Sequence, residues 1–228
     1  MFLLDLLFPK FCLGCGFLGS YICHNCKCKL IYLEKDLCIY CHKASLYGLT
    51  HPTCKRGEGV DGVISIFHYN NLLKSIIKSI KYRLATEVWN ELCLTINPDK
   101  LNKIKIFQEL AVSGYSLQPI PLHPNKFKKR GFNQAQIIAD FFSKFLRVGL
   151  ADNLIRIKDT QAQAQIAKNQ ARYFNMRGAF EAKNDTLIGS NIILVDDVMT
   201  TGSTLKEAAR VLKTAGARKV YVLTLAKG

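Results

Sequence analysis

The sequence predicts an α/β protein in which helices flank a parallel β-sheet, preceded by a small cysteine-rich module. Three observations lead to this fold class. From residue 60 onward, apolar β-branched runs alternate with amphipathic helical segments, and the later runs are apolar throughout, as in strands covered on both faces. Eight of the nine cysteines precede residue 55. The chain has 228 residues, enough for one α/β domain and a smaller module.

The N-terminal cysteines form pairs with the spacing of metal ligands. Two residues separate the members of each pair, and a histidine completes the last: Cys12/Cys15, Cys23/Cys26, Cys38/Cys41 and His51/Cys54. Such a gap lets a tight turn aim both side chains at one ion, and Zn²⁺ takes four thiolate or imidazole ligands. We expect the first two pairs to form one structural zinc site and the last two another. A crossed arrangement, a single occupied site, and Cys28 in place of Cys26 stay open.

The composition of the chain indicates its compartment and its partners. The apolar start MFLLDLLF is too short to span a bilayer and lacks the basic start and cleavage site of a signal peptide. We therefore expect a cytoplasmic protein without a transmembrane segment, in which thiols stay reduced and bind metal. The net charge is +15, of which residues 1–60 hold +3. This excess suits nucleic acid, anionic membrane or phosphorylated small molecules as partners, and a lysine-rich solvated surface is the alternative.

The elements after the cysteine module follow from hydrophobic periodicity. We expect a zinc-binding module over 1–59 and the α/β domain over 60–228. Residues 71–94 should form one or two helices, with Leu73, Ile76, Ile77, Ile80 and Leu84 on the apolar side and Lys74, Lys78 and Lys81 opposite. Helices are also expected over 133–146 and from 203 to a glycine stop. The expected strands are 60–69, 116–124, 153–157, 190–197 and 219–226.

A cluster of polar residues follows the strand Ile192–Val195. Asp196 and Asp197 stand at its carboxyl end, where parallel α/β sheets bind ligands. The loop Thr200–Thr204, hereafter the hydroxyl loop, then leads into a helix expected to start near Leu205. Backbone N–H groups of a glycine-containing turn at a helix N-terminus form an anion cradle. The loop therefore suits a phosphate monoester, and the carboxylates suit a diol with Mg²⁺ nearby, as in a 5-phosphorylated ribose. The alternative is a capped helix start.

A basic cluster follows the short strand that ends in PLHP. Lys126, Lys128, Lys129 and Arg130 fall within five residues of KFKKRGFNQ. We expect four cations on a mobile loop to neutralise a diphosphate or nucleic-acid phosphates.

At this point the sequence resembles a known family. VDDVMTTGST (195–204) is similar to the phosphoribosyl-diphosphate (PRPP) signature of type I phosphoribosyltransferases. The whole chain resembles the ComF family of competence-associated proteins, which join a zinc module to a phosphoribosyltransferase-like domain. The supporting motifs are PIPLH (119–123), RGFNQ (130–134), Gln163 with Arg172-x-x-Asn175, and GAF (178–180). The family usually has a cysteine where this chain has His51.

The resemblance implies a type I phosphoribosyltransferase-like sheet and roles for individual residues. Asp196 and Asp197 would hold the ribose hydroxyls as catalytic residues. Thr200, Thr201, Gly202, Ser203 and Thr204 would hold the 5-phosphate of Mg²⁺-bound PRPP, and Arg130 the diphosphate.

Two functions stay open. The first is the handling of single-stranded DNA during natural transformation. In this role the phosphates of the DNA backbone would be contacted by Lys126, Lys128, Lys129 and Arg130. Tyr69, Tyr82, Phe127 and Phe132 would stack on bases. Contact with other DNA-uptake proteins, peripheral to the inner membrane, would fit this role. The second is an active phosphoribosyltransferase, for which no acceptor-recognising segment is evident. We favour the first.

Overall fold

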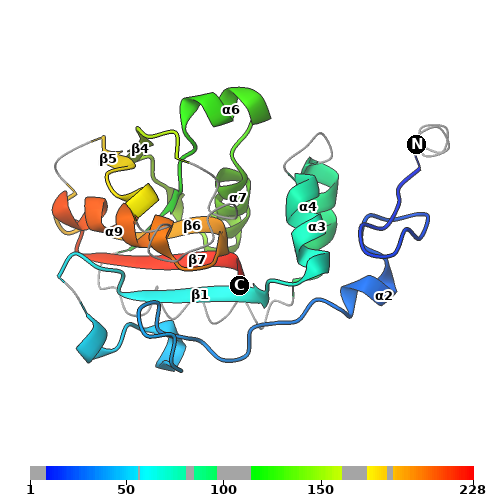
Figure 1. Cartoon of the computed structure of the whole chain (residues 1–228), viewed down its shortest axis with the longest axis horizontal. Helices are drawn as coiled ribbons and strands as arrows, with labels where there is room; N and C mark the ends of the chain where they lie inside the picture. Colours follow the sequence, from blue (N-terminus) through cyan, green and yellow to red (C-terminus); the bar gives the residue numbers. More distant parts are fainter. Residues whose placement is uncertain (1–8, 56, 81–84, 97–113, 161–173, 184–186) are drawn as a thin grey trace.

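A parallel sheet forms the centre of the computed structural model, which describes residues 9–55, 57–80, 85–96, 114–160, 174–183 and 187–228 (Figure 1). Its five strands have the order β1-β7-β6-β2-β3, and every neighbouring pair is parallel. The strands are β1 (Gly62–His68), β2 (Ser116–Pro119), β3 (Gly149–Leu150), β6 (Asn191–Met199) and β7 (Lys219–Lys227). The α/β fold expected from the sequence is confirmed.

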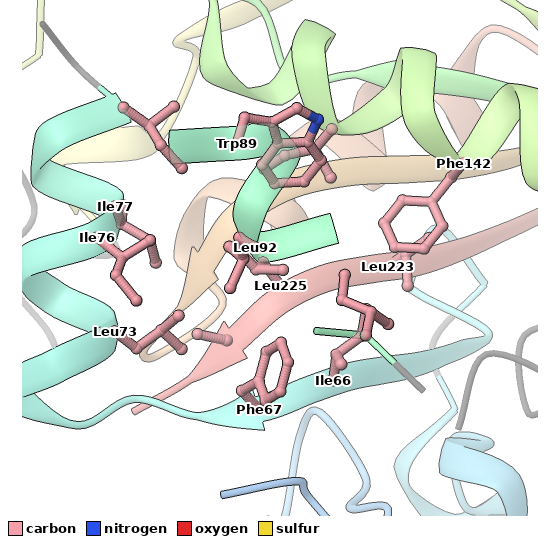
Figure 2. Close-up of a cluster of buried hydrophobic side chains, with 14 of the residues drawn as sticks. Ile66, Phe67, Leu73, Ile76, Ile77, Trp89, Leu92, Phe142, Leu223 and Leu225 are labelled. Atoms are coloured by element: carbon pink, nitrogen blue, oxygen red, sulfur yellow. The ribbon is translucent and has the colours of Figure 1, made fainter. Parts of the chain in front are cut away.

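Helices cover both faces of this sheet because its central strands are apolar on both sides. On β6, Ile193 and Val195 join one core cluster, while Ile192 and Leu194 join the other. Side chains of α3, α4 and α7 pack on the first face, and Figure 2 shows Ile76, Trp89 and Phe142 above β7 and β1. Helix α9 covers the second face. These helices are α3 (Asn71–Ile80), α4 (Ala85–Cys93), α7 (Gln134–Leu146) and α9 (Ser203–Thr214).

The apolar stripe predicted for residues 71–94 is confirmed within the described residues. Leu73, Ile76, Ile77 and Ile80 are all buried, whereas Lys74 and Lys78 are exposed. The segment forms two helices, and Lys81, Tyr82 and Leu84 lie outside the described residues.

One predicted strand does not join the main sheet. Residues 153–157 contain β4 (Leu154–Arg156), which pairs antiparallel with β5 (Phe180–Ala182) in a separate two-stranded sheet. Leu154 is 1% exposed but Ile155 is 37% exposed. A strand with only one apolar face buried suits a small flanking sheet rather than the centre of a parallel one.

The cysteine module lies along the edge of the main sheet. It contains the short helix α2 (His24–Lys27) and the 3₁₀ turns η1 (Leu46–Gly48) and η2 (Pro52–Cys54). Between them, the chain passes beside β1 (Figure 1), where Leu33 N donates to Ile66 O and His68 N to Ile31 O, both at 2.8 Å. These bonds occupy the edge strand, which would otherwise offer unpaired backbone groups. The division between 1–59 and 60–228 stays a prediction.

Candidate functional site

The candidate site lies where β6 ends and α9 begins. Asp196 and Asp197 lie within the last part of β6, which pairs with β7 as far as Met199 and Lys227. The strand predicted over 190–197 therefore ended two residues too early, because continued pairing with β7 carries β6 to Met199. Helix α9 begins at Ser203, the first residue of the helical run expected from 203, and Gly202 adopts the left-handed conformation (φ 71°) as its N-cap.

The hydroxyl loop is held by its own polar groups and by α9. Thr201 Oγ1 lies 2.8 Å from Ser203 Oγ and accepts from Ser203 N at 3.4 Å. Lys206 Nζ donates to Thr201 O at 3.1 Å. The loop thus turns tightly around the start of an α-helix of 12 residues, where backbone N–H groups and the helix dipole favour an anion.

A cavity of about 270 Å³ joins the loop to the carboxylates and to three cationic side chains. The cavity is lined by the following residues, all from the described part of the chain: Tyr69, Ile77, Ile120, Leu122, Lys126, Arg130, Asn133, Gln134, Ala135, Arg156 and the run 196–205.

Most of the residues predicted for the site meet at this cavity. Asp196, Asp197, the hydroxyl loop and Arg130 all line it, as does Lys126 from the basic cluster. Lys128 and Lys129 are exposed and are not among its lining residues. Of the aromatic residues predicted to stack on bases, Tyr69 lines the cavity and Phe127 is 48% exposed. Gln163 and Arg172 lie outside the described residues.

The basic cluster forms a helix, so the prediction of a loop was wrong. Helix α6 spans Pro124–Arg130, with the His123 side chain accepting from Asn125 N at its start. Pro124 at the first turn and left-handed Gly131 (φ 80°) at the end are the residues that favour such boundaries. On a helix, Lys126 and Arg130 are one turn apart and share a side, which lines the cavity, whereas Lys128 and Lys129 project from the other side into solvent.

Arg156 on β4 is a lining residue that the sequence interpretation missed. Its guanidinium donates to Thr160 Oγ1, and its carbon lies 5.5 Å from the centre of the Phe180 ring. Burial lowers the pKa of Arg156, although the carboxylates of Asp196 and Asp159 raise it, and Arg130 adds a smaller lowering. The available signal was an arginine inside the apolar run NLIRI, since a charge there needs a partner or a ligand.

Burial and a neighbouring carboxylate alter the ionisation of Asp196. Burial and the neighbouring charge of Asp197 raise the pKa of Asp196 to about 8, although Asp197 N donates to its carboxylate at 2.9 Å. Burial and Asp197 also raise the pKa of Tyr69. The pair therefore retains a proton at neutral pH, and hydroxyl donors or a cation in the cavity would favour its release.

Two groups of side chains that could hold a metal ion match the first predicted pairing. Within each group the ligand atoms all lie within 4.8 Å of one another, and the groups are Cys12/Cys15/Cys23/Cys26 and Cys38/Cys41/His51/Cys54. Neither a crossed pairing nor Cys28 appears in these groups, and Cys28 is exposed. Two ligands on one tetrahedral Zn²⁺ lie about 3.5–3.8 Å apart. Cys15 Sγ and Cys23 Sγ, 3.5 Å apart, fit this geometry.

The second group also fits in its outer contacts. His51 Nδ1 lies 3.3 Å from Cys41 Sγ, while His51 Nε2 lies 3.0 Å from Ala44 O. A carbonyl only accepts, so Nε2 carries the hydrogen and Nδ1 keeps its lone pair for a metal. His51 can therefore replace the usual cysteine. Backbone N–H groups outweigh burial and lower the pKa of Cys12 and of Cys38 to about 6, whereas burial and neighbouring thiols raise the pKa of Cys26 to about 12 and that of Cys54. Each group therefore has one thiol that readily becomes a thiolate.

Comparison with known proteins agrees with this fold. A model of the phosphoribosyl transferase domain matches residues 128–228. The chain is 28% identical over 206 residues to competence protein ComFC of Bacillus subtilis, covering 86% of this chain and 79% of that protein. It is 24% identical over 214 residues to DNA utilization protein YhgH of Escherichia coli strain K12, covering 90% of each. Among solved structures it matches glutamine PRPP amidotransferase from B. subtilis over 52% of this chain and 24% of that one. That match has 19% identity and a TM-score of 0.33, too low to bear on the fold.

The sheet, the site and the matched domain define a protein with a phosphoribosyltransferase-like domain and an N-terminal module able to hold two metal ions. Its similarity over most of its length to relatives named competence protein ComFC and competence protein F supports a ComF-family protein. Within the described residues, no helix combines the length and the apolar character needed to cross a bilayer.

Proposed function

We propose that this protein serves natural transformation by handling single-stranded DNA, and that its cavity binds a 5-phosphorylated ribose such as PRPP together with Mg²⁺. One observation carries the proposal for the cavity: two carboxylates, the hydroxyl loop and three cations surround one space of about 270 Å³. A ribose phosphate combines a diol, which donates hydrogen bonds to carboxylates, with an anion that suits a helix N-terminus. The DNA role follows the names of the relatives, a competence protein and a DNA utilization protein.

Different residues of the cavity would bind different parts of the ligand. Asp196 and Asp197 would accept hydrogen bonds from the ribose hydroxyls, and the backbone and hydroxyl groups of Thr201 and Ser203 would donate to the 5-phosphate. Lys126 and Arg130 would face a diphosphate. Mg²⁺ would supply further neutralisation of the diphosphate charge. The carboxylates are suited to hold such a cation because oxygen ligands are those that Mg²⁺ prefers.

The outer face of α6 supports the DNA role. Lys128, Lys129 and Phe127 are exposed there, while Lys126 and Arg130 of the same helix line the cavity. Exposed cations beside an exposed aromatic side chain match the combination that binds single strands, with phosphates on the charges and bases on the ring. The net charge of +15 supplies long-range attraction to DNA. Lys74 and Lys78 on α3 add an exposed basic face.

An active phosphoribosyltransferase is the second candidate, favoured by carboxylates and cations meeting in one cavity. A nitrogen nucleophile would form a bond to C1 of the ribose while the bond from C1 to the diphosphate oxygen breaks. Asp196 and Asp197 would stabilise the positive charge that develops on the sugar. Lys126 and Arg130 would stabilise the leaving diphosphate. Release of pyrophosphate from PRPP in the presence of a base would establish this reaction, and no turnover with any common base would exclude it for those bases.

Two matched double variants test the proposed function. Lys128→Ala/Lys129→Ala removes two charges from the outer face of α6, and Lys126→Ala/Arg130→Ala removes two from the cavity. We measure binding of a fluorescent single-stranded oligonucleotide at two salt concentrations and binding of Mg²⁺-PRPP by calorimetry. The outer variant should lose DNA affinity and keep PRPP affinity, and the inner variant should do the reverse. Counterion release should make DNA binding strongly salt-sensitive.

Other results would change the proposal in definite ways. If PRPP displaces the oligonucleotide and the inner variant loses both ligands, DNA occupies the cavity itself. If the wild-type protein shows no salt-sensitive DNA binding, the DNA role is wrong. If PRPP does not bind with Mg²⁺ present, the assignment of the cavity is wrong.

A further inference from the structure

The segment between two metal ligands of the cysteine module contacts the hydroxyl loop, more than 160 residues further along the chain. Cys38 and Cys41 belong to the second metal-ligating group, and Ile39 and Tyr40 lie between them. Both of these side chains reach the loop or the lysine that holds it. The contact is therefore between the turn that a metal would organise and the turn that faces the cavity.

Ile39 packs directly against Gly202. It is 1% exposed and belongs to the same core cluster as Met199 and Leu205, on either side of the loop. A Cβ atom added to Gly202 would lie 3.2 Å from both Cγ1 and Cδ1 of Ile39. Since Gly202 is the left-handed N-cap of α9, Ile39 supports the loop at the residue where its backbone turns.

Tyr40 reaches the loop through Lys206. Its ring centre lies 5.2 Å from Lys206 Nζ, and that amine donates to Thr201 O at 3.1 Å. The Tyr40 hydroxyl accepts from Val60 N at 2.9 Å, which fixes the ring against the start of the α/β domain. Lys206 is thus held between an aromatic face and a carbonyl of the loop, a cation–π arrangement that stabilises its position.

The first metal-ligating group has different surroundings. Ile22 N, beside its ligand Cys23, donates to Glu91 of α4 at 2.8 Å, and a Cβ atom on Gly14 would lie 2.7 Å from Leu72 Cδ1. This group is therefore placed against α3 and α4. Leu13, between its ligands Cys12 and Cys15, occupies the position that Ile39 has in the second group. It supplies a matched control.

We propose that the Cys38/Cys41/His51/Cys54 group positions the hydroxyl loop through Ile39 and Tyr40, so that metal in this group preserves the phosphate affinity of the cavity. An anion cradle binds well only when its N–H groups are held in place before the ligand arrives. A metal ion bound to this group would fix the turn from Cys38 to Cys41, which contacts Gly202 through Ile39 and Lys206 through Tyr40. Ile39 and Tyr40 are positioning residues. The phosphate part of the inference rests on the proposed function, whereas the positioning part does not.

The test separates loop order from ligand binding. We measure hydrogen exchange of amides 200–206 in the ligand-free protein, zinc content, and binding of ribose 5-phosphate with Mg²⁺. The variants are Ile39→Ala and Tyr40→Leu, with Leu13→Ala as the control. Both test variants should keep their zinc and the slow amide exchange of β7. Exchange of the loop amides should become faster. Ribose 5-phosphate binding should weaken about tenfold, because small misplacements of binding groups are costly. Leu13→Ala should change neither loop exchange nor ligand affinity.

Each remaining outcome decides one part of the proposal. Unchanged loop exchange in both variants overturns the positioning role. Faster loop exchange with no ribose 5-phosphate binding in the wild-type protein leaves the positioning role standing and contradicts the proposed function. Equal effects from Leu13→Ala would mean general loosening and would overturn the specific contact. If Ile39→Ala loses the protection of β7, Ile39→Val carries the same test with one methylene less.

Discussion

Asp196→Asn should stabilise the protein, and more so at alkaline pH than at acid pH. Burial and Asp197 raise the pKa of Asp196 from 3.8 to about 8. Between these two pKa values the folded protein keeps a proton on Asp196 that the unfolded chain has lost. The free energy of unfolding therefore decreases as the pH rises from about 4 to about 8. Asparagine has nearly the same shape and never ionises, so the variant escapes this loss.

The size of the effect follows from the pKa difference. Each pKa unit corresponds to about 1.36 kcal/mol, so the cost of the buried carboxylate grows by at most about 4 kcal/mol between pH 5 and pH 8. The cavity admits water to the partly exposed carboxylate, so we expect about half of this, roughly 2 kcal/mol. For a chain of this length that corresponds to a rise in Tm of roughly 4–8 °C.

Urea and thermal unfolding at pH 5 and pH 8.5 measure this difference. Asp140→Asn on α7 is the matched control, because it also removes one carboxylate from a partly buried position but lies outside the cavity lining. This control measures how much the loss of one negative charge by itself changes the stability of a protein whose net charge is already +15. Equal stabilisation by Asp196→Asn at both pH values would refute the reasoning, since the carboxylate would then be ionised throughout. The variant should also lose ribose 5-phosphate affinity, as expected where a binding site is held at a cost in stability.

Two further predictions concern metal content and the support of α9. Cys26→Ser should lower the zinc content from two ions per chain to about one, whereas Cys28→Ser should leave it at two, because only Cys26 belongs to a ligand group. Elemental analysis of the purified variants decides this, and equal loss in both would contradict the assignment. Glu207→Gln should cost about 1–3 kcal/mol at pH 7, because the 3% exposed carboxylate accepts from Gly178 N at 2.8 Å and pairs with Arg210. These partners outweigh burial and hold the pKa of Glu207 below 4.5, so the difference in urea stability from the wild type should shrink as pH falls below that value.

Local patterns in the sequence were sufficient to predict the main helices and strands, the cysteine groups and the loop 200–204. The apolar run 192–195 predicted a buried strand because only a strand with both faces covered is apolar throughout. The two-residue gaps between cysteines predicted the two ligand groups because the gap itself sets the turn. The glycine and hydroxyl residues of 200–204 predicted a tight turn before a helix for the same local reason.

The ends of elements, and the sheet that a strand joins, depended on residues outside the local segment. β6 extends to Met199 because β7 continues beside it. Residues 124–130 form a helix because His123 and Gly131 cap its two ends, although the run of cations had suggested a mobile loop. β4 lies outside the main sheet because its partner is β5.

The sequence by itself determined the fold class, the two candidate metal-binding groups, and the loop with its two carboxylates, because each depends on spacing along the chain. Only the tertiary structure decided that Arg156 joins Lys126 and Arg130 at the cavity, and that Ile39 packs against Gly202. These contacts join segments far apart in sequence. Their formation depends on how helices and turns pack on the sheet, and no local period or spacing records that packing.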